Sequence, residues 1–175
     1  MMKFATAIFA FTALISMPAL ANDSDSAFFK KVTGKWAGPG EIVAGKYKGT
    51  KFTCNFDGST ATATNGMTMD GTCRVGVFSQ AMKATVAMSG GSYKGSFLDG
   101  SSGKGLDITA GNVAGNRATF SLNRKQLNGA MLARLTSESD MNVTISVRVN
   151  KDMVPVIGMS LKRIDDTATG TVAQK

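Results

Sequence analysis

The sequence predicts an all-β domain, folded as a single antiparallel up-and-down β-barrel of about 8–10 strands with a short N-terminal helical turn. Three observations support this prediction. Apolar and polar residues alternate in a series of short segments, Gly, Asn and Asp separate these segments, and helical signals are nearly confined to residues 23–33. A two-sheet β-sandwich is the alternative, but a barrel leaves no exposed strand edge and needs only short hairpins.

The alternation has a period of two, as expected for strands that bury one face. It is clearest in residues 141–149, and it recurs in residues 52–56, 67–77, 82–88, 117–122 and 157–161. Five Asp-Gly or Asn-Gly pairs supply residues that tolerate positive φ and predict tight turns: Asp57-Gly58, Asn65-Gly66, Asp70-Gly71, Asp99-Gly100 and Asn128-Gly129. For Asp70-Gly71, a β-bulge within a strand is the alternative.

Residues 1–21 predict a cleaved signal peptide. Lys3 is followed by a largely apolar stretch, and Ala19 and Ala21 form the small-x-small pattern that precedes a cleavage site, so cleavage is expected after Ala21. The apolar run is too short to span a bilayer core of roughly 30 Å. The protein is therefore expected to be periplasmic or secreted and not to span the membrane.

The mature chain is predicted to form one domain. Residues 22–33 are expected to make a short helical lead-in, which Ser24 or Ser26 could cap. Residues 34–165 are expected to form the barrel and residues 166–175 a flexible C-terminal tail.

The chain has two cysteines, and in an exported protein Cys54 and Cys73 predict a structural disulfide. Both lie on the apolar faces of successive segments, opposite each other if those strands pair about residues 63–64.

Charge and composition exclude several classes of function. The formal net charge is +8 at pH 7, but the basic residues are spread along the chain without the charged blocks and exposed aromatics of nucleic-acid binders. The sequence contains no histidine, which removes the usual general base, zinc ligand and catalytic triad. No enzymatic activity, metal or cofactor is predicted. The Met67-Thr68-Met69 pair could bind Cu(I), but apolar filling of the interior by methionine is favoured.

Both tyrosines of the chain lie in similar hexapeptides, GKYKGT at residues 45–50 and GSYKGS at residues 91–96. Each follows an apolar segment and precedes another strand. Glycine could turn the chain, tyrosine could cover the start of the returning strand, and the second glycine could let that strand bend. The pair therefore predicts two similar corners of the barrel around Tyr47 and Tyr93.

Residues 28–36, with the sequence FFKKVTGKW, resemble the start of a calycin barrel of the lipocalin and fatty-acid-binding group, in which a helical turn leads into a G-x-W motif. Gly34 and Trp36 match that motif. The resemblance implies that Trp36 closes one end of the barrel and that Arg163 packs over it. The chain departs from the lipocalin pattern because it has no T-D-Y-type motif and no C-terminal helix, and Gly38-Pro39-Gly40 is unusual. The chain also resembles small exported proteobacterial proteins, which imply no activity.

The apolar inward faces lead to the hypothesis of a barrel that binds a small hydrophobic ligand, for which an anionic molecule such as a fatty acid is one candidate. The candidate ligand-lining residues are Phe52, Phe56, Met67, Met69, Met82, Val86, Met88, Phe120, Met141, Ile145 and Met159. The methionines of the mature chain all fit inward-facing positions. The candidate head-group contacts are Lys46, Lys48 and Lys51.

The alternative hypothesis is a filled barrel with a structural or interaction role at the cell envelope. In that case outward-facing Lys83, Arg117, Arg134 and Arg148 would contact an anionic envelope polymer. Strand parity predicts which residues point inward, but it does not distinguish an empty interior from a filled one. The sequence therefore leaves both hypotheses open.

Overall fold

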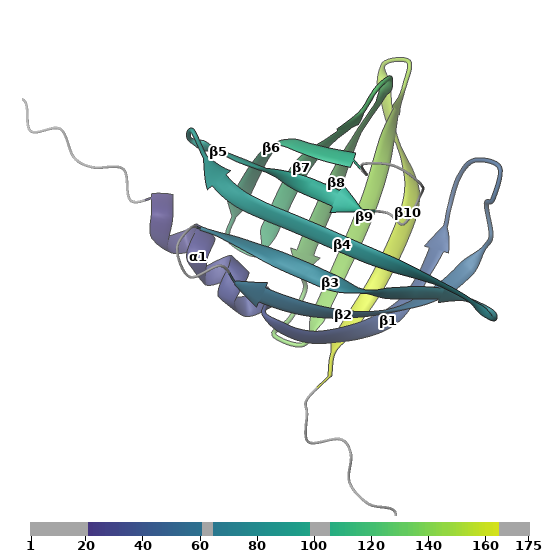
Figure 1. Ribbon diagram of the computed structural model, residues 1–175, viewed down its shortest axis with the longest axis horizontal. Coiled ribbons are helices and arrows are strands. Elements are labelled where there is room, and N and C mark those ends of the chain that lie inside the picture. The colour runs from purple at the N-terminus through teal and green to yellow at the C-terminus, as the bar shows by residue number, and fades with distance from the viewer. Residues whose placement is uncertain (1–20, 61–64, 99–105, 165–175) are drawn as a thin grey trace, which may run out of the picture.

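The computed structural model describes residues 21–60, 65–98 and 106–164, which form one helix and a closed barrel of antiparallel strands (Figure 1). The elements are α1 (Ala21–Val32), β1 (Gly34–Ile42), β2 (Lys51–Thr60), β3 (Gly66–Val75), β4 (Phe78–Ser89), β5 (Ser92–Leu98), β6 (Leu106–Ala114), β7 (Arg117–Arg124), β8 (Leu127–Leu135), β9 (Asp140–Val149) and β10 (Asp152–Arg163). Each strand pairs with its sequence neighbours, and β10 pairs with β1 to close the barrel. The up-and-down barrel is confirmed and the sandwich alternative is wrong.

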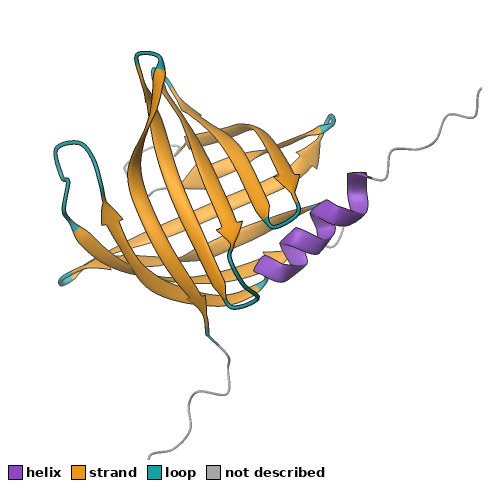
Figure 2. Cartoon of the chain, turned by 180° about the vertical axis from the view of Figure 1, so that it is seen from behind, coloured by secondary structure: helices purple, strands orange, loops and turns teal. Residues whose placement is uncertain are grey.

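Helix α1 lies across one end of the barrel, which we call the closed end, and contacts β2, β3 and β6 (Figures 1 and 2). Phe28, Phe29 and Val32 are buried there. The helix begins at Ala21, so Ser24 and Ser26 lie inside it and do not cap it as predicted. Of the predicted signal peptide only Ala21 is described, and the predicted C-terminal tail lies outside the described residues. Within the described ranges, no helix has the length and apolar character needed to cross a membrane.

The hairpins turn at positions that the Asp-Gly and Asn-Gly pairs did not predict. Two-residue turns occur at Gly76-Val77, Gly90-Gly91, Gly115-Asn116, Lys125-Gln126 and Asn150-Lys151. Gly90 and Gly91 have φ values of 59° and 77°, and glycine adopts this left-handed conformation without steric cost. Asn65-Gly66 marks the start of β3, and Asp99-Gly100 lies outside the described residues.

The remaining predicted turns are wrong, because Asp57-Gly58, Asp70-Gly71 and Asn128-Gly129 lie within strands. Gly71 shows why glycine is needed inside a strand. It pairs with Phe56 without a register shift, which also excludes the predicted bulge, and a Cβ at Gly71 would lie 2.7 Å from the Phe56 ring. The glycine therefore makes room for a large neighbour and does not turn the chain.

A β-bulge in β10 changes which side chains point inward. The register between β10 and β9 shifts between Pro155 and Ile157. Ile157 and the alternate residues after it face inward, whereas Met153, on the other side of the shift, is 40% exposed. The prediction that every methionine of the mature chain faces inward is therefore wrong for Met153. A bulge adds one residue to the strand, so the inward and outward positions before it are exchanged relative to those after it.

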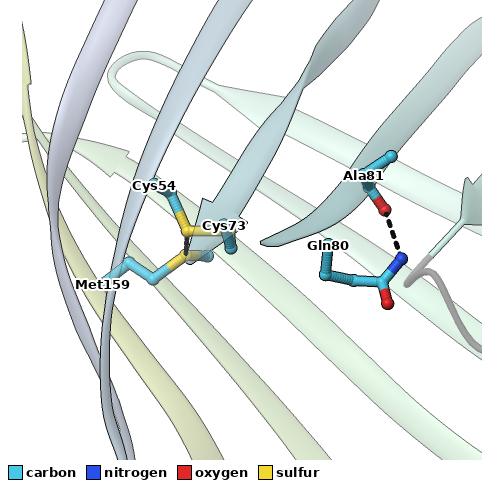
Figure 3. The surroundings of a disulfide bond; sticks show 5 residues. All are labelled: Cys54, Cys73, Gln80, Ala81 and Met159. Atoms are coloured by element: carbon cyan, nitrogen blue, oxygen red, sulfur yellow. Dashed lines mark hydrogen bonds between the residues drawn. A yellow bond between two sulfur atoms is a disulfide. The ribbon is translucent and has the colours of Figure 1, made fainter. Parts of the chain in front are cut away.

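The predicted disulfide is confirmed. Cys54 on β2 lies directly opposite Cys73 on β3, with a Cα–Cα distance of 4.0 Å. Because both cysteines occupy inward positions, the bond crosses the inner surface of the barrel wall, where Met159 approaches it (Figure 3). The disulfide therefore ties together two neighbouring strands close to the barrel interior.

The two tyrosine hexapeptides do not form similar corners, so that prediction is wrong. Tyr47 lies in the loop between β1 and β2 and is 63% exposed, with Lys46 Nζ 5.4 Å from the centre of its ring. Tyr93 lies in β5 and is 1% exposed. The second glycines also differ, because Gly49 is in the loop, whereas Gly95 is inside β5 against the β4 backbone.

Candidate functional site

The closed end of the barrel is built around Trp36. Its side chain is completely buried, and its Nε1 donates a hydrogen bond to the main-chain oxygen of Val32 at 2.9 Å. The guanidinium group of Arg163 lies over the indole ring, with Cζ 4.4 Å from the ring centre. This guanidinium also donates hydrogen bonds to the main-chain oxygens of Lys31, Thr33 and Glu138. Arg163 therefore links helix α1, the last strand and the turn between β8 and β9, and it closes this end.

Tyr93 provides a second buried polar contact at the closed end. Its hydroxyl donates to Asp25 Oδ2 at 2.9 Å, and both side chains are buried. Burial raises the pKa of Tyr93 well above its usual value, and the hydrogen bond to Asp25 raises it further. The ring packs edge-on against Phe29 and Phe120, with centroid distances of 5.3 Å and 6.1 Å. This arrangement anchors α1 to the barrel and leaves the phenol protonated.

An apolar cavity of about 80 Å³ lies inside the barrel. We call it the inner cavity. It is lined by Phe28 and Val32 of α1 together with inward side chains of the strands: Phe56, Met67, Met69, Ala84, Val86, Phe97, Phe120, Met131, Ala133, Met141, Val143, Met159 and Leu161. None of these described lining side chains carries a charge, so the inner cavity suits only apolar groups.

A larger pocket of about 330 Å³ lies at the opposite, open end of the barrel. We call it the mouth pocket. Its lining is mostly apolar and comes from β1 to β4, β9 and β10: Ile42, Phe52, Cys73, Val75, Phe78, Ser79, Gln80, Met82, Ile145, Ile157 and Met159. The polar side chains among these described residues are Ser79 and Gln80, since Cys73 is part of the disulfide. The mouth pocket therefore combines an apolar wall with an uncharged hydrogen-bonding group.

Met159 is the described residue that lines both the inner cavity and the mouth pocket. Its sulfur lies 4.0 Å from Cys54 Sγ (Figure 3), and this is a packing contact because a disulfide sulfur carries no proton. Gly40 allows the close approach of Met159 and Phe52. A Cβ at Gly40 would lie 2.2 Å from the Phe52 ring and 2.9 Å from Met159 Cγ. A flexible thioether at such a position can move aside for a ligand.

Comparison with known proteins supports the fold. No protein-family model matches the sequence, and no curated protein matches it. Among solved structures, the chain is similar to the crystal structure of a variant of the fluorescent protein UnaG, with a TM-score of 0.53 and 11% sequence identity. The match covers 78% of this chain and 99% of that chain. The chain has a calycin-like barrel fold.

Most of the candidate ligand-lining residues of this calycin-like barrel lie around the two spaces. Phe56, Met67, Met69, Val86, Phe120 and Met141 line the inner cavity, Phe52, Met82 and Ile145 line the mouth pocket, and Met159 lines both. Met88 lines neither, because it lies beside Tyr93 in the β4–β5 pairing, close to the closed end. Whether these residues contact a ligand stays a prediction.

The lysines predicted to contact an acidic head group lie outside the mouth pocket. Lys46 and Lys48 are exposed in the loop between β1 and β2, and Lys51 faces outward opposite Glu41. None of the three belongs to the lining of the mouth pocket. The calycin-like barrel therefore offers no cation from this group to a carboxylate bound in its mouth pocket.

The outward cations proposed for envelope contact are scattered over the barrel. Lys83 pairs with Asp70 at 3.0 Å, Arg148 lies opposite Met153, and Arg117 lies directly opposite Arg134. They do not form one continuous surface. Arg117 and Arg134 place two positively charged guanidinium groups opposite each other on adjacent strands.

Sequence reasoning missed several residues of the mouth pocket. Val75 and Ile157 could have been added by strand parity, whereas Phe78 and Gln80 follow a turn whose position was not predicted. Gly40 was noticed only as part of an unusual glycine-proline-glycine segment. Its role depends on the cross-strand neighbours Phe52 and Met159, which no local pattern reveals.

Proposed function

We propose that this protein binds a small, uncharged hydrophobic molecule in the mouth pocket, with the apolar part of the ligand directed toward the inner cavity. The observation that carries this proposal is the position of Met159, which lines both spaces. A flexible side chain therefore lies where the two spaces approach each other. Calycin-like folds with an apolar interior are suited to small ligands, which supports the same function.

The volumes set the manner of binding. An engineered apolar cavity of about 150 Å³ binds benzene, whereas the inner cavity has only about 80 Å³. A ligand tail can therefore enter only if side chains such as Met159 and Met69 rearrange. The mouth pocket, at about 330 Å³, holds the rest of the ligand without such movement. Methionine side chains are flexible enough to permit this rearrangement.

The polar groups at the mouth favour an uncharged ligand over an anionic one such as a fatty acid. The Gln80 amide donates a long hydrogen bond of 3.4 Å to the main-chain oxygen of Ala81 (Figure 3). A ligand hydroxyl or carbonyl oxygen could replace the Ala81 oxygen as the acceptor. A carboxylate would need a cation or several donors to offset its loss of hydration. The described lining of the mouth pocket contains no charged side chain.

The proposal extends to the absence of catalysis and to export. We propose binding without catalysis because the sequence lacks histidine and because the described linings of both spaces contain no ionisable group. Export is supported by the apolar N-terminal segment of the sequence and by the disulfide. Oxidised cysteines of this kind are typical of proteins outside the cytosol.

Competition binding tests the proposal. A fatty alcohol and a fatty acid of equal chain length would compete with the neutral fluorescent probe N-phenylnaphthylamine at a pH where the acid is ionised. We expect the alcohol to bind more tightly. Gln80→Ala should weaken alcohol binding about fivefold, as expected for the loss of one hydrogen bond of about 1 kcal/mol. Gln126→Ala, at the exposed turn between β7 and β8, is the matched control.

The possible outcomes separate the alternatives. Tighter binding of the acid, weakened by Lys46→Gln with Lys48→Gln, would restore the anionic ligand and contradict the uncharged one. If neither compound displaces the probe, and native mass spectrometry of protein purified from its own host shows the bare mass, the barrel is filled. In that case an envelope role, supported only by the opposed pair Arg117 and Arg134, becomes the better proposal.

A further inference from the structure

The tip of the β3–β4 hairpin exposes large apolar side chains. Val77 is 91% exposed and Phe78 is 79% exposed, and Val75 beside them is 43% exposed. Single exposed apolar residues are ordinary on protein surfaces. Adjacent ones at a protruding turn are unusual, because they lower solubility without contributing to the core.

The other hairpins at the open end show the same feature. The β1–β2 loop, the β7–β8 turn and the β9–β10 turn lie on the side of the barrel away from α1 (Figures 1 and 2). Each carries exposed apolar side chains, and the end of β5 adds another: Val43, Tyr47, Leu98, Leu127, Val149 and Met153. Together with Val75, Val77 and Phe78, they form what we call the apolar rim.

Cations surround the apolar rim. Exposed basic side chains occur in the same loops and at the adjacent strand ends: Lys46, Lys48, Lys51, Arg74, Lys125, Arg148 and Lys151. The acidic residues described at this end are Glu41, opposite Lys51, Asp107 near the start of β6, and Asp152 at the start of β10, so the cations listed above outnumber them. The open end is therefore both apolar at its tips and positively charged around them.

The described turns at the closed end have a different composition. The β4–β5 turn consists of Gly90 and Gly91 between serines, and the β6–β7 turn is Gly115-Asn116. The β8–β9 turn, residues 136–139, contains Glu138 and hydroxyl side chains. These turns carry no exposed large apolar side chain. The combination of apolar tips and cations is therefore a property of one end of the barrel and not of its hairpins in general.

We propose that the open end docks onto the surface of an anionic lipid bilayer. Val77 and Phe78 enter the region between head groups and acyl chains, and Lys46, Lys48 and Lys151 lie near the lipid phosphates. Apolar side chains that insert beside basic ones are the common requirement for binding at a bilayer interface. Attraction of cations to anionic head groups provides the charge complementarity. A soluble anionic polymer would use the cations but leave the apolar tips exposed to water.

Docking would also serve the proposed ligand site, although it does not depend on it. Val75 and Phe78 belong both to the apolar rim and to the mouth pocket. A hydrophobic molecule could then pass between the bilayer and the pocket without crossing water, which strongly disfavours apolar groups. The inference concerns the surface of the open end, so it can fail or hold independently of ligand binding.

Tryptophan fluorescence provides the first test. The chain has a single tryptophan, Trp36, and it is fully buried, so a Phe78→Trp variant adds one exposed reporter. Vesicles of phosphatidylcholine mixed with phosphatidylglycerol should shift its emission to shorter wavelength, and lipids brominated on their acyl chains should quench it. Vesicles of phosphatidylcholine alone should have a much smaller effect. The absence of a shift and of quenching with the anionic vesicles would overturn the proposal.

Cosedimentation of variants with the same vesicles provides the second test. Val77→Ser with Phe78→Ser should reduce the bound fraction about tenfold, whereas Ile164→Ser, an exposed apolar residue next to the closed end, should leave it unchanged. Lys46→Gln with Lys48→Gln should reduce binding about thirtyfold at low salt, as expected for the loss of two cations near an anionic surface. Arg117→Gln with Arg134→Gln removes the same charge from the outer wall and is the matched control.

Two results would contradict docking through the rim. Equal losses in the two charge variants, without an effect of the serine variants, would indicate general electrostatic attraction. Retention on a column of anionic polysaccharide that depends on Lys46 and Lys48 but not on Phe78 would indicate a soluble polymer as the partner. Ligand competition in solution separates these results from failure of the proposed function, because it requires no membrane.

Discussion

At the scale of single residues, the buried hydrogen bond between Tyr93 and Asp25 links packing to pH. Burial, and after it the hydrogen bond to Asp25, keeps the pKa of Tyr93 well above its usual value. In the unfolded chain the phenol ionises near pH 10. The contribution of Tyr93 to stability is therefore fully present below about pH 10 and decreases as the pH rises above that value.

We expect Tyr93→Phe to lower the free energy of unfolding by about 1–2 kcal/mol at neutral pH, since it removes a buried hydrogen bond but keeps the ring contacts. The variant should also lose stability less steeply than the unmodified protein above pH 10. Urea unfolding followed by circular dichroism at several pH values measures both effects. Tyr47→Phe is the matched control, because Tyr47 lies in a similar hexapeptide but its side chain is exposed. Equal effects of the two substitutions would contradict this account.

These tyrosines also show what local sequence does not determine. Tyr47 and Tyr93 have nearly identical neighbours in the chain, yet one lies in an exposed loop and the other in a buried strand. The difference comes from the partner strands and from helix α1, which are distant in the sequence. By contrast, the contact between Trp36 and Arg163 could be anticipated, because a resemblance to calycins supplied the tertiary information.

At the scale of elements, β2 and β3 are the described pair of strands that is joined by a disulfide in addition to its hydrogen bonds. Their register could be predicted from the sequence, since both cysteines fall on apolar faces and a hairpin about residues 63–64 places them opposite each other. The register of β10 could not be predicted in the same way. Its bulge near Pro155 interrupts the alternation, and the sequence shows only a proline that could also lie at an edge or in a turn.

Loss of the disulfide should destabilise the barrel without preventing its formation. We expect Cys54→Ala with Cys73→Ala to lower the free energy of unfolding by about 3 kcal/mol, the value for closing a loop of this size. Thermal unfolding with and without reductant measures the effect. Reductant should lower the melting temperature of the unmodified protein toward that of the variant and should not affect the variant. If reductant also lowered the melting temperature of the variant, the loss of stability in the unmodified protein could not be assigned to the disulfide.

At the scale of the whole molecule, the barrel has two different ends. Helix α1, Trp36 and Arg163 close one end, and the mouth pocket lies at the other, with Met159 between that pocket and the inner cavity. The sequence could predict the inward faces that line these spaces. It could not predict their volumes, because a volume of tens of Å³ depends on side-chain packing and on close approaches such as that at Gly40.

Removal of the side chain between the two spaces should change ligand selection. We expect Met159→Ala to join the mouth pocket to the inner cavity and to increase the affinity for longer alkyl alcohols relative to shorter ones. The lost packing should cost about 2 kcal/mol of stability. Probe competition across a series of chain lengths, together with urea unfolding, measures both effects. Met153→Ala on the same strand is the control, because Met153 lies outside the barrel. An unchanged chain-length profile would contradict a role for Met159 as the partition.

The seam between β1 and β10 also has a consequence for how the chain folds. Trp36 pairs with Arg163, so the first and last strands of the described chain must meet for the barrel to close. Contacts between residues so far apart in sequence form slowly, because the loop that must close is long. Until β10 is synthesised, the edges of β1 and β9 remain unpaired. A nascent chain therefore cannot close its barrel before its last strand has been synthesised, and an incomplete chain has no closed form of this fold.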